Sequence, residues 1–322
     1  MEKNYGKFSN FRHLIFWFNL KFLIIIPAHN EESSISFCLK SLQNQSFQDF
    51  VCIVVNDGST DRTSEIINGV KVQDLRFKIQ NLELSEHQPG AKVVRTFNKG
   101  LESVDINDFD VVCKFDADIV FPRNYLEKVN QVFEKNPKSG VVSGLVYIRN
   151  YKQNPEIKNL KIPSENIFDF SNTKKDWVFE ILSSKDHVRG PIKAYRKECF
   201  EDMNGLRAVL GWDNLDVLLA KKNGWEVVTM KDLWVKHLRP TAYKYKDQKA
   251  EKLGQYFYNI GLSLPLAIIS SAKSSFKNRS AKEFFITINS FLSQKEKRDL
   301  NKNEIKFIRN LRWKEFFKNL GL

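Results

Sequence analysis

The stretch that decides the fold is Val111-Val112-Cys113-Lys114-Phe115-Asp116-Ala117-Asp118, a mainly apolar run that ends in two carboxylates. A short run rich in β-branched residues predicts a buried strand. In an open α/β sheet, ligands bind just beyond the carboxyl ends of the strands. Two acidic side chains there are costly unless a cation neutralises them, and a hard divalent ion is the usual solution. Asp116 and Asp118 therefore predict a site for a metal ion and a diphosphate, and a plain acidic turn is the alternative.

Two earlier segments repeat the pattern of an apolar strand that ends in polar residues. They are Leu23-Ile24-Ile25-Ile26 before Pro27-Ala28-His29-Asn30-Glu31, and Phe50-Val51-Cys52-Ile53-Val54-Val55 before Asn56-Asp57-Gly58-Ser59-Thr60-Asp61. Gly58 permits a tight turn, and Asp61 is assigned to capping the helix that follows. Such strand–helix alternation predicts parallel strands that are joined by right-handed crossovers.

The remaining pattern up to residue 240 extends this sheet. Strands are expected over residues 76–84, 110–115, 140–148 and 224–228, an ordered segment of no assigned type over 190–196, and helices over 93–104, after Pro122, over 198–200 and after Trp212. Residues 149–186 are polar and irregular, and we interpret them as a long excursion over the sheet. Loops of this length tend to be functional.

Composition limits the class of protein. With 322 residues and 42% hydrophobic content, the chain can bury one large core or two smaller ones. The four cysteines lie far apart without a C-x-x-C pair, and three of them are inside apolar runs. This usage favours free thiols in a reducing compartment over disulfides or a zinc site.

The formal net charge of +13 is concentrated at the end of the chain, where residues 241–322 hold 17 Lys and Arg against 7 Asp and Glu. Such asymmetry indicates an anionic partner, either a membrane or a nucleic acid. The last helix is expected to carry an apolar stripe among cations, namely Ile305, Ile308, Leu311, Phe316 and Leu320. A basic amphipathic helix is typical of membrane-surface contact, and packing on the catalytic domain is the alternative. No run reaches the roughly 18 apolar residues of a spanning helix.

The N-terminus resembles a secretion signal only superficially. Cations precede the apolar run from Leu14 to Ile26, but Asn19 and Lys21 interrupt it and no small-x-small cleavage site follows. We therefore predict an N-terminal extension (1–20), a catalytic domain (21–240) and a helical basic region (241–322). A cytoplasmic protein on the inner face of a membrane is the expected location.

Four segments in this order resemble a family 2 glycosyltransferase with the GT-A fold, and the resemblance covers about residues 20–240. They are Pro27-Ala28-His29-Asn30-Glu31, Asn56-Asp57-Gly58-Ser59-Thr60-Asp61, Asp116-Ala117-Asp118 and Trp212-Asp213. The resemblance implies an α/β fold with a mostly parallel sheet flanked by helices. It also implies inverting transfer of a sugar from a nucleotide-sugar, with UDP as the favoured nucleotide, to a saccharide or lipid-linked acceptor hydroxyl. The expected setting is surface polysaccharide or glycolipid synthesis in a bacterium.

The same resemblance places the site residues. It implies that Asp213 is the base and that an Mg²⁺ or Mn²⁺ ion is bound by Asp116, Asp118 and His237. The implied donor-binding residues are Pro27, His29, Glu31, Asp57, Lys92 and Asp116. Lys92 and Arg95 have a second interpretation as solvent-facing residues, and His237 has one as a structural residue.

The chain departs from the family pattern next to the base. Trp212 stands where the family has Glu, and the second acid, Asp216, comes three residues after Asp213 instead of two. Asp216 is therefore the less favoured base. Asp213 could also be only a helix cap, because Asp is a preferred N-cap. For Trp212 and Trp177, packing in the core is favoured over stacking on a sugar.

Two other functions remain as alternatives. A sugar-1-phosphate nucleotidyltransferase shares this kind of sheet, but it needs a Gly-rich basic loop after the first strand, where Pro27-Ala28-His29-Asn30-Glu31 stands. A nucleic-acid binder would use the basic tail, yet the chain has no recognised nucleic-acid module. A dehydrogenase is not expected because no G-x-G-x-x-G follows the first strand.

Overall fold

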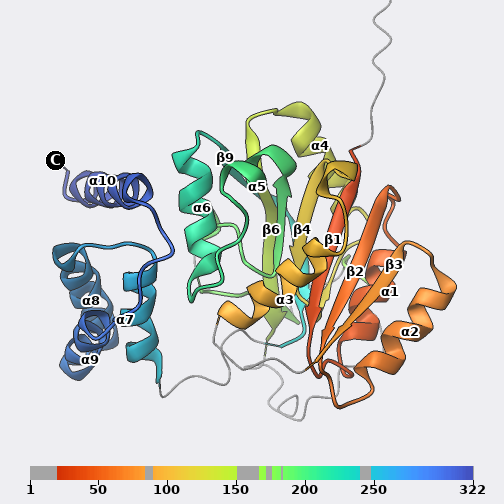
Figure 1. The fold of residues 1–322 in the computed structure, drawn as a ribbon, viewed down its shortest axis with the longest axis horizontal. Helices are drawn as coiled ribbons and strands as arrows, with labels where there is room; N and C mark the ends of the chain where they lie inside the picture. The colour runs from red at the N-terminus through yellow and green to blue at the C-terminus, as the bar shows by residue number, and fades with distance from the viewer. Residues whose placement is uncertain are drawn as a thin grey trace, which may run out of the picture.

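The computed structural model describes residues 20–83, 90–150, 167–171, 176–182, 184–239 and 248–321. A central sheet carries helices on both faces, and four further helices stand beside it (Figure 1). The strands are β1 Phe22–Ala28, β2 Phe50–Asp57, β3 Phe77–Leu82, β4 Val111–Phe115, β5 Ile119–Val120, β6 Ser139–Arg149, β7 Trp177–Phe179, β8 Ile192–Arg196 and β9 Glu226–His237. The helices are α1 Ile35–Gln43, α2 Thr63–Gln73, α3 Ala91–Glu102, α4 Tyr125–Lys135, α5 Lys197–Asp202, α6 Trp212–Lys222, α7 Lys249–Asn259, α8 Leu264–Asn278, α9 Ala281–Leu292 and α10 Lys302–Asn319.

The sheet has a parallel half and a mixed half. Its order is β3-β2-β1-β4-β8-β6-β9-β5, and β7 pairs with β6. Strands β3, β2, β1 and β4 are parallel, as predicted from their strand–helix alternation. In contrast, β8 runs antiparallel to β4 and β6, and β5 runs antiparallel to β9. The carboxyl ends of β1, β2 and β4 therefore meet at one edge, where the polar segments predicted to bind the donor begin.

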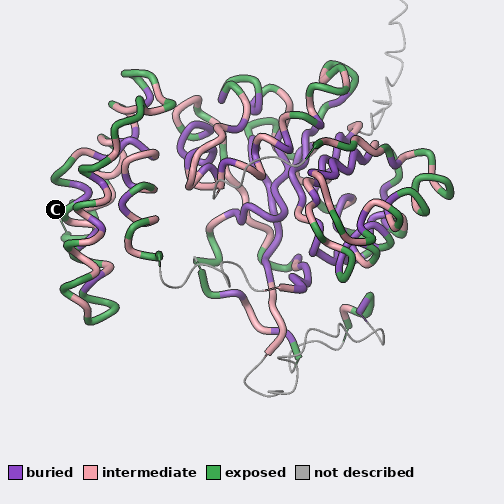
Figure 2. Tube along the Cα trace, turned by 60° about the horizontal axis from the view of Figure 1, so that its bottom comes forward, coloured by how far each residue is buried: buried purple, intermediate pink, exposed green. Residues whose placement is uncertain are grey.

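Alternation along the strands divides the core into two layers. In β1, Phe22, Ile24 and Ile26 belong to a cluster with α1, α2 and α4 on one face. Leu23 and Ile25 belong to a second cluster, which holds residues of α3, α5 and α6 on the other face. Because successive side chains of a strand point to opposite faces, one apolar run supplies both layers. Figure 2 shows the central strands as the most buried part of the molecule.

Some predicted elements differ from those in the structure. The excursion over 149–186 contains β7, and part of it, residues 151–166, 172–175 and 183, lies outside the described residues. The last predicted strand, over 224–228, is much longer and includes His237 at its end as β9. Most of the predicted N-terminal extension (1–19) also lies outside the described residues, as does the predicted boundary near residue 240.

The four C-terminal helices share the second core layer. Residues from each of α7, α8, α9 and α10 belong to the same buried cluster as α6, among them Phe257, Leu266, Phe291 and Ile308. Figure 1 shows α10 next to α6. The apolar stripe predicted for the last helix is thus used partly for packing, since Ile308 is fully buried and Leu311 packs against the cluster. None of the described helices is both long and apolar enough to cross a bilayer.

Candidate active site

The first two strand-to-helix loops are bonded to each other. His29 Nδ1 lies 2.7 Å from the Asp57 carbonyl oxygen, and the Asn30 backbone N–H donates to Ser59 Oγ at 3.0 Å. Asp61 accepts from the backbone N–H of Thr63, the first residue of α2, at 2.9 Å, although the N-cap position of this helix is Arg62 and not Asp61. These bonds fix the segments after β1 and β2 as one unit.

Asp57 ends β2 in a buried position. Its Oδ2 accepts a hydrogen bond from Thr96 Oγ1 at 3.0 Å and lies 3.3 Å from Lys92 Nζ, and both of these residues are on α3. The structure therefore places Lys92 against Asp57 at the end of β2, with most of its side chain shielded from solvent. Pro27 lies in β1 itself, paired with Val55 of β2, directly before His29.

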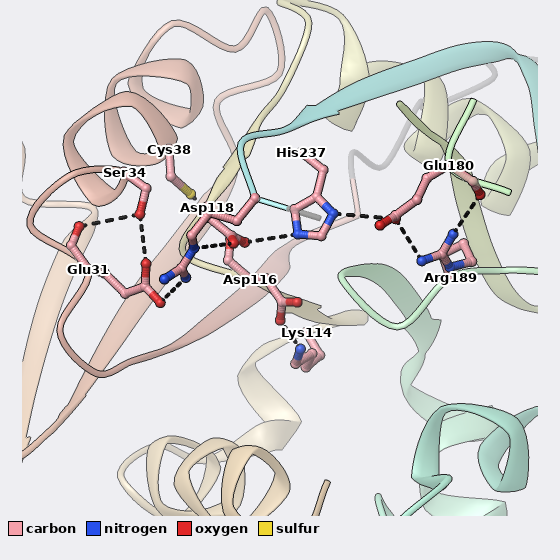
Figure 3. Close-up of polar contacts among 10 residues, drawn as sticks. Glu31, Ser34, Cys38, Lys114, Asp116, Asp118, Glu180, Arg189 and His237 are labelled. Atoms are coloured by element: carbon pink, nitrogen blue, oxygen red, sulfur yellow. Dashed lines mark hydrogen bonds and ion pairs between the residues drawn. The ribbon is translucent and has the colours of Figure 1, made fainter. Parts of the chain in front are cut away.

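Asp118 is the centre of a chain of charged side chains (Figure 3). Its Oδ1 lies 3.4 Å from His237 Nε2, and Nδ1 of the same imidazole lies 3.4 Å from Glu180 Oε2. Glu180 is in turn paired with Arg189 at 2.8 Å. Burial alone would raise the pKa of Asp118, but the charges and hydrogen bonds of His237 and Arg239 outweigh it and hold the pKa below its usual range.

The contacts that lower the pKa of Asp118 raise the pKa of His237. Burial disfavours the imidazolium, yet the charge of Asp118 and the hydrogen bonds to Asp118 and Glu180 prevail and raise the pKa of His237 to about 10. In the protein without a metal ion, His237 is therefore protonated at neutral pH and balances the buried carboxylates.

Arg239 connects Asp118 to the first loop. Its Nε donates to Asp118 Oδ2 at 3.0 Å, and its Nη2 donates to Glu31 Oε1. The other Glu31 oxygen, Oε2, accepts from Ser34 Oγ at 2.7 Å. Burial and the charge of Asp118 raise the pKa of Glu31 in spite of Arg239. Glu31 and Asp118, which are far apart in the sequence, thus share one guanidinium.

Asp116 faces a different partner. Its carboxylate accepts from Lys114 Nζ, and its backbone N–H donates to the Pro191 carbonyl at 2.9 Å. Figure 3 shows Asp116 turned towards Lys114, while Asp118 lies on the line to His237. Asp116 and Asp118 therefore do not converge on one point in this structure.

Asp213 lies beside the same loop as Asp116. A Cβ atom added to Gly190 would be 3.1 Å from Asp213 Cβ and 3.3 Å from its Oδ2, so the side chain rests against the Gly190 backbone. The N-cap of α6 is Gly211, and no side chain caps the helix. Asp213 is therefore not the helix cap that the sequence offered as an alternative. Within the described residues, its half-buried carboxylate accepts no hydrogen bond and forms no ion pair.

Asp216 is occupied by other groups. It is 2% exposed, its two oxygens lie 2.8 and 2.7 Å from Lys193 Nζ, and Tyr195 Oη donates to it at 2.5 Å. These bonds leave it poorly suited to take a proton from a substrate. The indole of Trp212 covers the ammonium groups of Lys114 and Lys193, at 5.1 and 5.6 Å from its centroid. Trp212 and Trp177 are both buried, which agrees with the expectation that they pack in the core.

The residues present fit a divalent ion that takes few protein ligands. The 3.4 Å between Asp118 Oδ1 and His237 Nε2 suits two neighbouring ligands of one ion, each about 2.1 Å from it. In the part of the chain that the structure describes, no three His, Cys, Asp or Glu side chains gather around one point. Mg²⁺ commonly takes one or two carboxylates and completes its shell with phosphate and water. Such a pair of ligands is enough for an ion that arrives with a diphosphate.

The sequence did not reveal several residues of this site. Arg239 follows a strand end just as Asp57 does, so the same reasoning could have found it. Lys114 and Lys193 stand as single charges inside apolar strand runs, which is a signal of a buried ion pair. Glu180 lies in the irregular excursion and gave no signal.

Comparison with known proteins defines the family. Residues 23–203, more than half of the chain, match the family described as Glycosyl transferase family 2. The chain therefore belongs to glycosyltransferase family 2, and the predicted family is confirmed. The matched range contains the carboxylates at the ends of β2 and β4, and it stops before Asp213 and β9.

Curated relatives resemble only part of the chain. A poly-beta-1,6-N-acetyl-D-glucosamine synthase of Staphylococcus epidermidis is 30% identical over 126 residues, which cover 39% of this chain and 28% of that protein. The amylovoran biosynthesis glycosyltransferase AmsB of Erwinia amylovora is 29% identical over 131 residues, which cover 40% of this chain and 41% of that protein. The match thus spans less than half the length of either relative.

Solved structures confirm the fold class. The structure of S. aureus TarS 1-349 in complex with UDP-GlcNAc has a TM-score of 0.55 and 21% identity, and covers 84% of this chain and 79% of that one. The mannosyltransferase PcManGT from Pyrobaculum calidifontis, in complex with GDP-Man and Mn²⁺, has a TM-score of 0.53 and 16% identity, and covers 94% of this chain and 76% of that one. At these identities the likeness shows the fold, which is the predicted GT-A type.

Proposed function

We propose that this protein is an inverting glycosyltransferase that moves a sugar from a nucleotide-sugar to an acceptor hydroxyl. The proposal rests on one observation: the acidic side chains at this edge of the sheet differ in whether a cation lies beside them. Glu31, Asp57, Asp116 and Asp118 each lie against a cation, whereas Asp213 has no such partner in the described residues. Paired acids are suited to binding, and an accessible unpaired carboxylate is suited to taking a proton.

The donor nucleotide is assigned to the carboxyl ends of β1 and β2, with the diphosphate beside β4. Asp57 and Glu31 offer oxygens to ribose and base, and Asp116 directly follows β4 at the same edge of the sheet. A Mg²⁺ or Mn²⁺ ion would be held by Asp118 and His237 and would offset charge on the departing diphosphate. His237 Nε2 binds an ion only in its deprotonated form, so ion binding there would release a proton.

Asp213 is assigned as the base. The acceptor hydroxyl loses its proton as it attacks, and a carboxylate must stand within reach of that proton. Asp213 contacts Gly190, and Asp116 contacts the adjoining Pro191. These two contacts support the proposal that the donor sugar and the acceptor bind beside this loop. The bonds of Asp216 to Lys193 and Tyr195 favour Asp213 over Asp216 for this role.

The substrate class is proposed from the relatives. One is named as a poly-beta-1,6-N-acetyl-D-glucosamine synthase and another as an amylovoran biosynthesis glycosyltransferase, so a surface polysaccharide or related glycolipid is the proposed product. UDP is the proposed nucleotide, in line with the UDP-GlcNAc complex of TarS. GDP is the main alternative nucleotide, in line with the GDP-Man complex of PcManGT. The family match favours this function over a nucleotidyltransferase or a nucleic-acid binder.

We also propose peripheral contact with the cytoplasmic face of a membrane, through α8. Its residues Leu264, Ile268, Ala272 and Phe276 recur every four positions and are all exposed, so they form one apolar stripe. Lys273 and Lys277 are exposed beside it. An apolar stripe flanked by cations is the pattern of a helix that lies on anionic lipid.

Thermal unfolding with and without nucleotide tests the donor assignment. We expect UDP with Mn²⁺ to raise the unfolding temperature, because a ligand that binds only the folded state stabilises it by mass action. GDP and dTDP with Mn²⁺, and each nucleotide without metal, are the comparisons. The absence of any shift with all three nucleotides would contradict the proposal.

Replacement of Asp213 by Asn tests the chemical assignment. Loss of a general base lowers turnover by about 10²–10⁴, while nucleotide binding survives because Asp213 lies outside the nucleotide contacts. Turnover is measured as nucleotide release in the presence of acceptor, and binding as the thermal shift with UDP and Mn²⁺. Native turnover of Asp213→Asn would remove Asp213 from the mechanism.

A further inference from the structure

We propose that Lys193 and Asp216 form a buried ion pair that positions Asp213, with Tyr195 as its third member. This inference rests on the proposed role of Asp213 as the base. It concerns residues that the substrate itself does not contact, so they are positioning residues and not catalytic ones.

The three side chains form a closed hydrogen-bonded group. Lys193 is 0% and Asp216 2% exposed, with Nζ 2.8 and 2.7 Å from the two carboxylate oxygens. Tyr195 Oη completes the carboxylate at 2.5 Å and is itself fully buried. Burial, together with the charge of Asp216, raises the pKa of Tyr195 well above its usual range, so the phenol stays protonated as a donor.

This group is bonded directly to the residue that it would position. Lys193 Nζ also donates to the backbone carbonyl of Asp213, so one ammonium binds both the first turn of α6 and the carboxylate one turn later. Lys193 belongs to β8, a central strand that pairs with β4. The pair therefore ties the N-terminal turn of α6 to an interior strand of the sheet.

The start of α6 receives no hydrogen bond from a capping side chain. The N-cap residue of the helix is Gly211 in the left-handed conformation (φ +89°). The surrounding residues of this core layer are apolar, for example Leu215 and Val112. A buried ion pair in such surroundings is often no more stable than apolar side chains of similar size. Stability alone therefore does not explain the pair, whereas positioning of Asp213 does.

The test replaces the whole group with apolar side chains of similar shape, so that no buried charge is left alone. The variant is Lys193→Met with Tyr195→Phe and Asp216→Leu, and it is compared with the native protein and with Asp213→Asn. A misplacement of about 1 Å can cost roughly 10²-fold in rate. We expect turnover to fall at least about tenfold, with the apparent KM for the donor and the UDP–Mn²⁺ thermal shift unchanged.

The ion pair between Arg76 and Asp74 provides the control. It lies at 2.6 Å with both side chains partly buried, directly before β3 and thus at the end of the parallel strands opposite to the candidate site. Arg76→Met with Asp74→Leu removes this pair, and we expect native turnover from it. A general loss of rigidity would lower turnover in both variants, whereas positioning lowers it only in the first.

The outcomes separate the two proposals. If Asp213→Asn loses turnover but the triple variant retains it, the positioning role is wrong and the base assignment stands. If Asp213→Asn keeps native turnover, the base assignment itself fails. Should the triple variant not fold, Asp216→Asn keeps the shape and one acceptor oxygen, and the same fall in turnover with unchanged UDP binding is expected. Native turnover of a folded Asp216→Asn would overturn the inference.

Discussion

The acids of the site differ from one another in whether a cation faces them. Asp57 lies against Lys92, Asp116 against Lys114, and Asp118 against both His237 and Arg239. A buried carboxylate is tolerated when it is paired and hydrogen-bonded. Such a balanced edge can accept a nucleotide diphosphate together with a divalent ion without a large change in net charge. Asp213 has no cation paired with its carboxylate in the described residues, which is why we propose it as the general base.

Gly190 gives a residue-scale prediction. Gly190→Ala would place a methyl group 3.1 Å from Asp213 Cβ and 3.3 Å from Oδ2, so the Asp213 side chain must move by a few tenths of an ångström. Gly190 is not among the glycines with positive φ, so alanine meets no backbone penalty there. We expect turnover to fall about tenfold, since small displacements of a reacting group are costly. Nucleotide release by the purified variant is the measurement.

The control for this variant is another glycine exchanged for alanine. Gly69 lies in α2 with no atom within 4 Å of an added Cβ, so Gly69→Ala should retain native turnover. It should also gain about 0.5–1 kcal/mol of stability, because alanine favours a helix interior more than glycine does. Native turnover of Gly190→Ala would show that Asp213 tolerates displacement and would weaken its assignment as base.

Sequence reasoning found the acids at strand ends and missed the lysines inside strands. Asp57, Asp116 and Asp118 stand where an apolar run stops, and in a parallel sheet such positions share one edge. Lys114 and Lys193 are separated by 78 intervening residues in the chain, and only the antiparallel pairing of β4 with β8 brings them opposite each other. Long-range antiparallel pairing depends on tertiary packing and is not readable from a local pattern.

At the scale of elements, α10 shows how one pattern permits two structures. Its apolar stripe among cations predicted a membrane-surface helix, with packing on the catalytic domain as the alternative. In the structure Ile308 is fully buried, and Leu311 and Trp313 pack against the cluster that includes α6. A capping box of Asn301 and Glu304 begins the helix. The stripe is the same in both interpretations, because periodicity defines a face but not what covers that face.

The packing of α10 predicts a measurable loss of stability. Ile308→Ala leaves a cavity in the shared core layer, and such truncations cost about 2–5 kcal/mol. We expect the free energy of unfolding, from urea denaturation followed by circular dichroism, to fall by that amount. Lys306→Ala, an exposed exchange on the same helix, should change it by no more than about 0.5 kcal/mol. Equal stabilities of the two variants would show that α10 is not docked as described.

At the scale of the whole molecule, the predicted helical basic region shares a buried core with the sheet. The buried cluster on the α6 face continues from the sheet through α7, α8, α9 and α10, across the predicted boundary near residue 240. Tyr256 of α7 packs against Gly211, where a Cβ atom would be only 2.2 Å from its ring. The C-terminal helices therefore support the helix that carries Asp213, in addition to any role at a surface. Composition and charge could not reveal this, because they describe the tail without its neighbours.

This arrangement leaves an apolar stripe of α8 exposed along the length of the helix. Leu264 and Ile268 are about 40% exposed and Phe276 is 88% exposed, while the opposite face, with Ala267 and Ser271, is buried. Lys273 and Lys277 beside the stripe would each add roughly 1 kcal/mol on anionic lipid. The expected partner is thus a membrane that carries net negative charge, and salt should weaken the contact.

Flotation with lipid vesicles tests this surface. The native protein should float with vesicles of phosphatidylglycerol and phosphatidylethanolamine at low salt, and it should be released at high salt or with purely zwitterionic vesicles. Ile268→Ser with Phe276→Ser on α8 should lower the bound fraction at least about tenfold. Phe317→Ser with Leu320→Ser removes two exposed apolar side chains from α10 instead, and it should bind as the native protein does. If only the α10 variant loses binding, the contact belongs to α10, and if the native protein never floats, the proposed membrane contact is wrong.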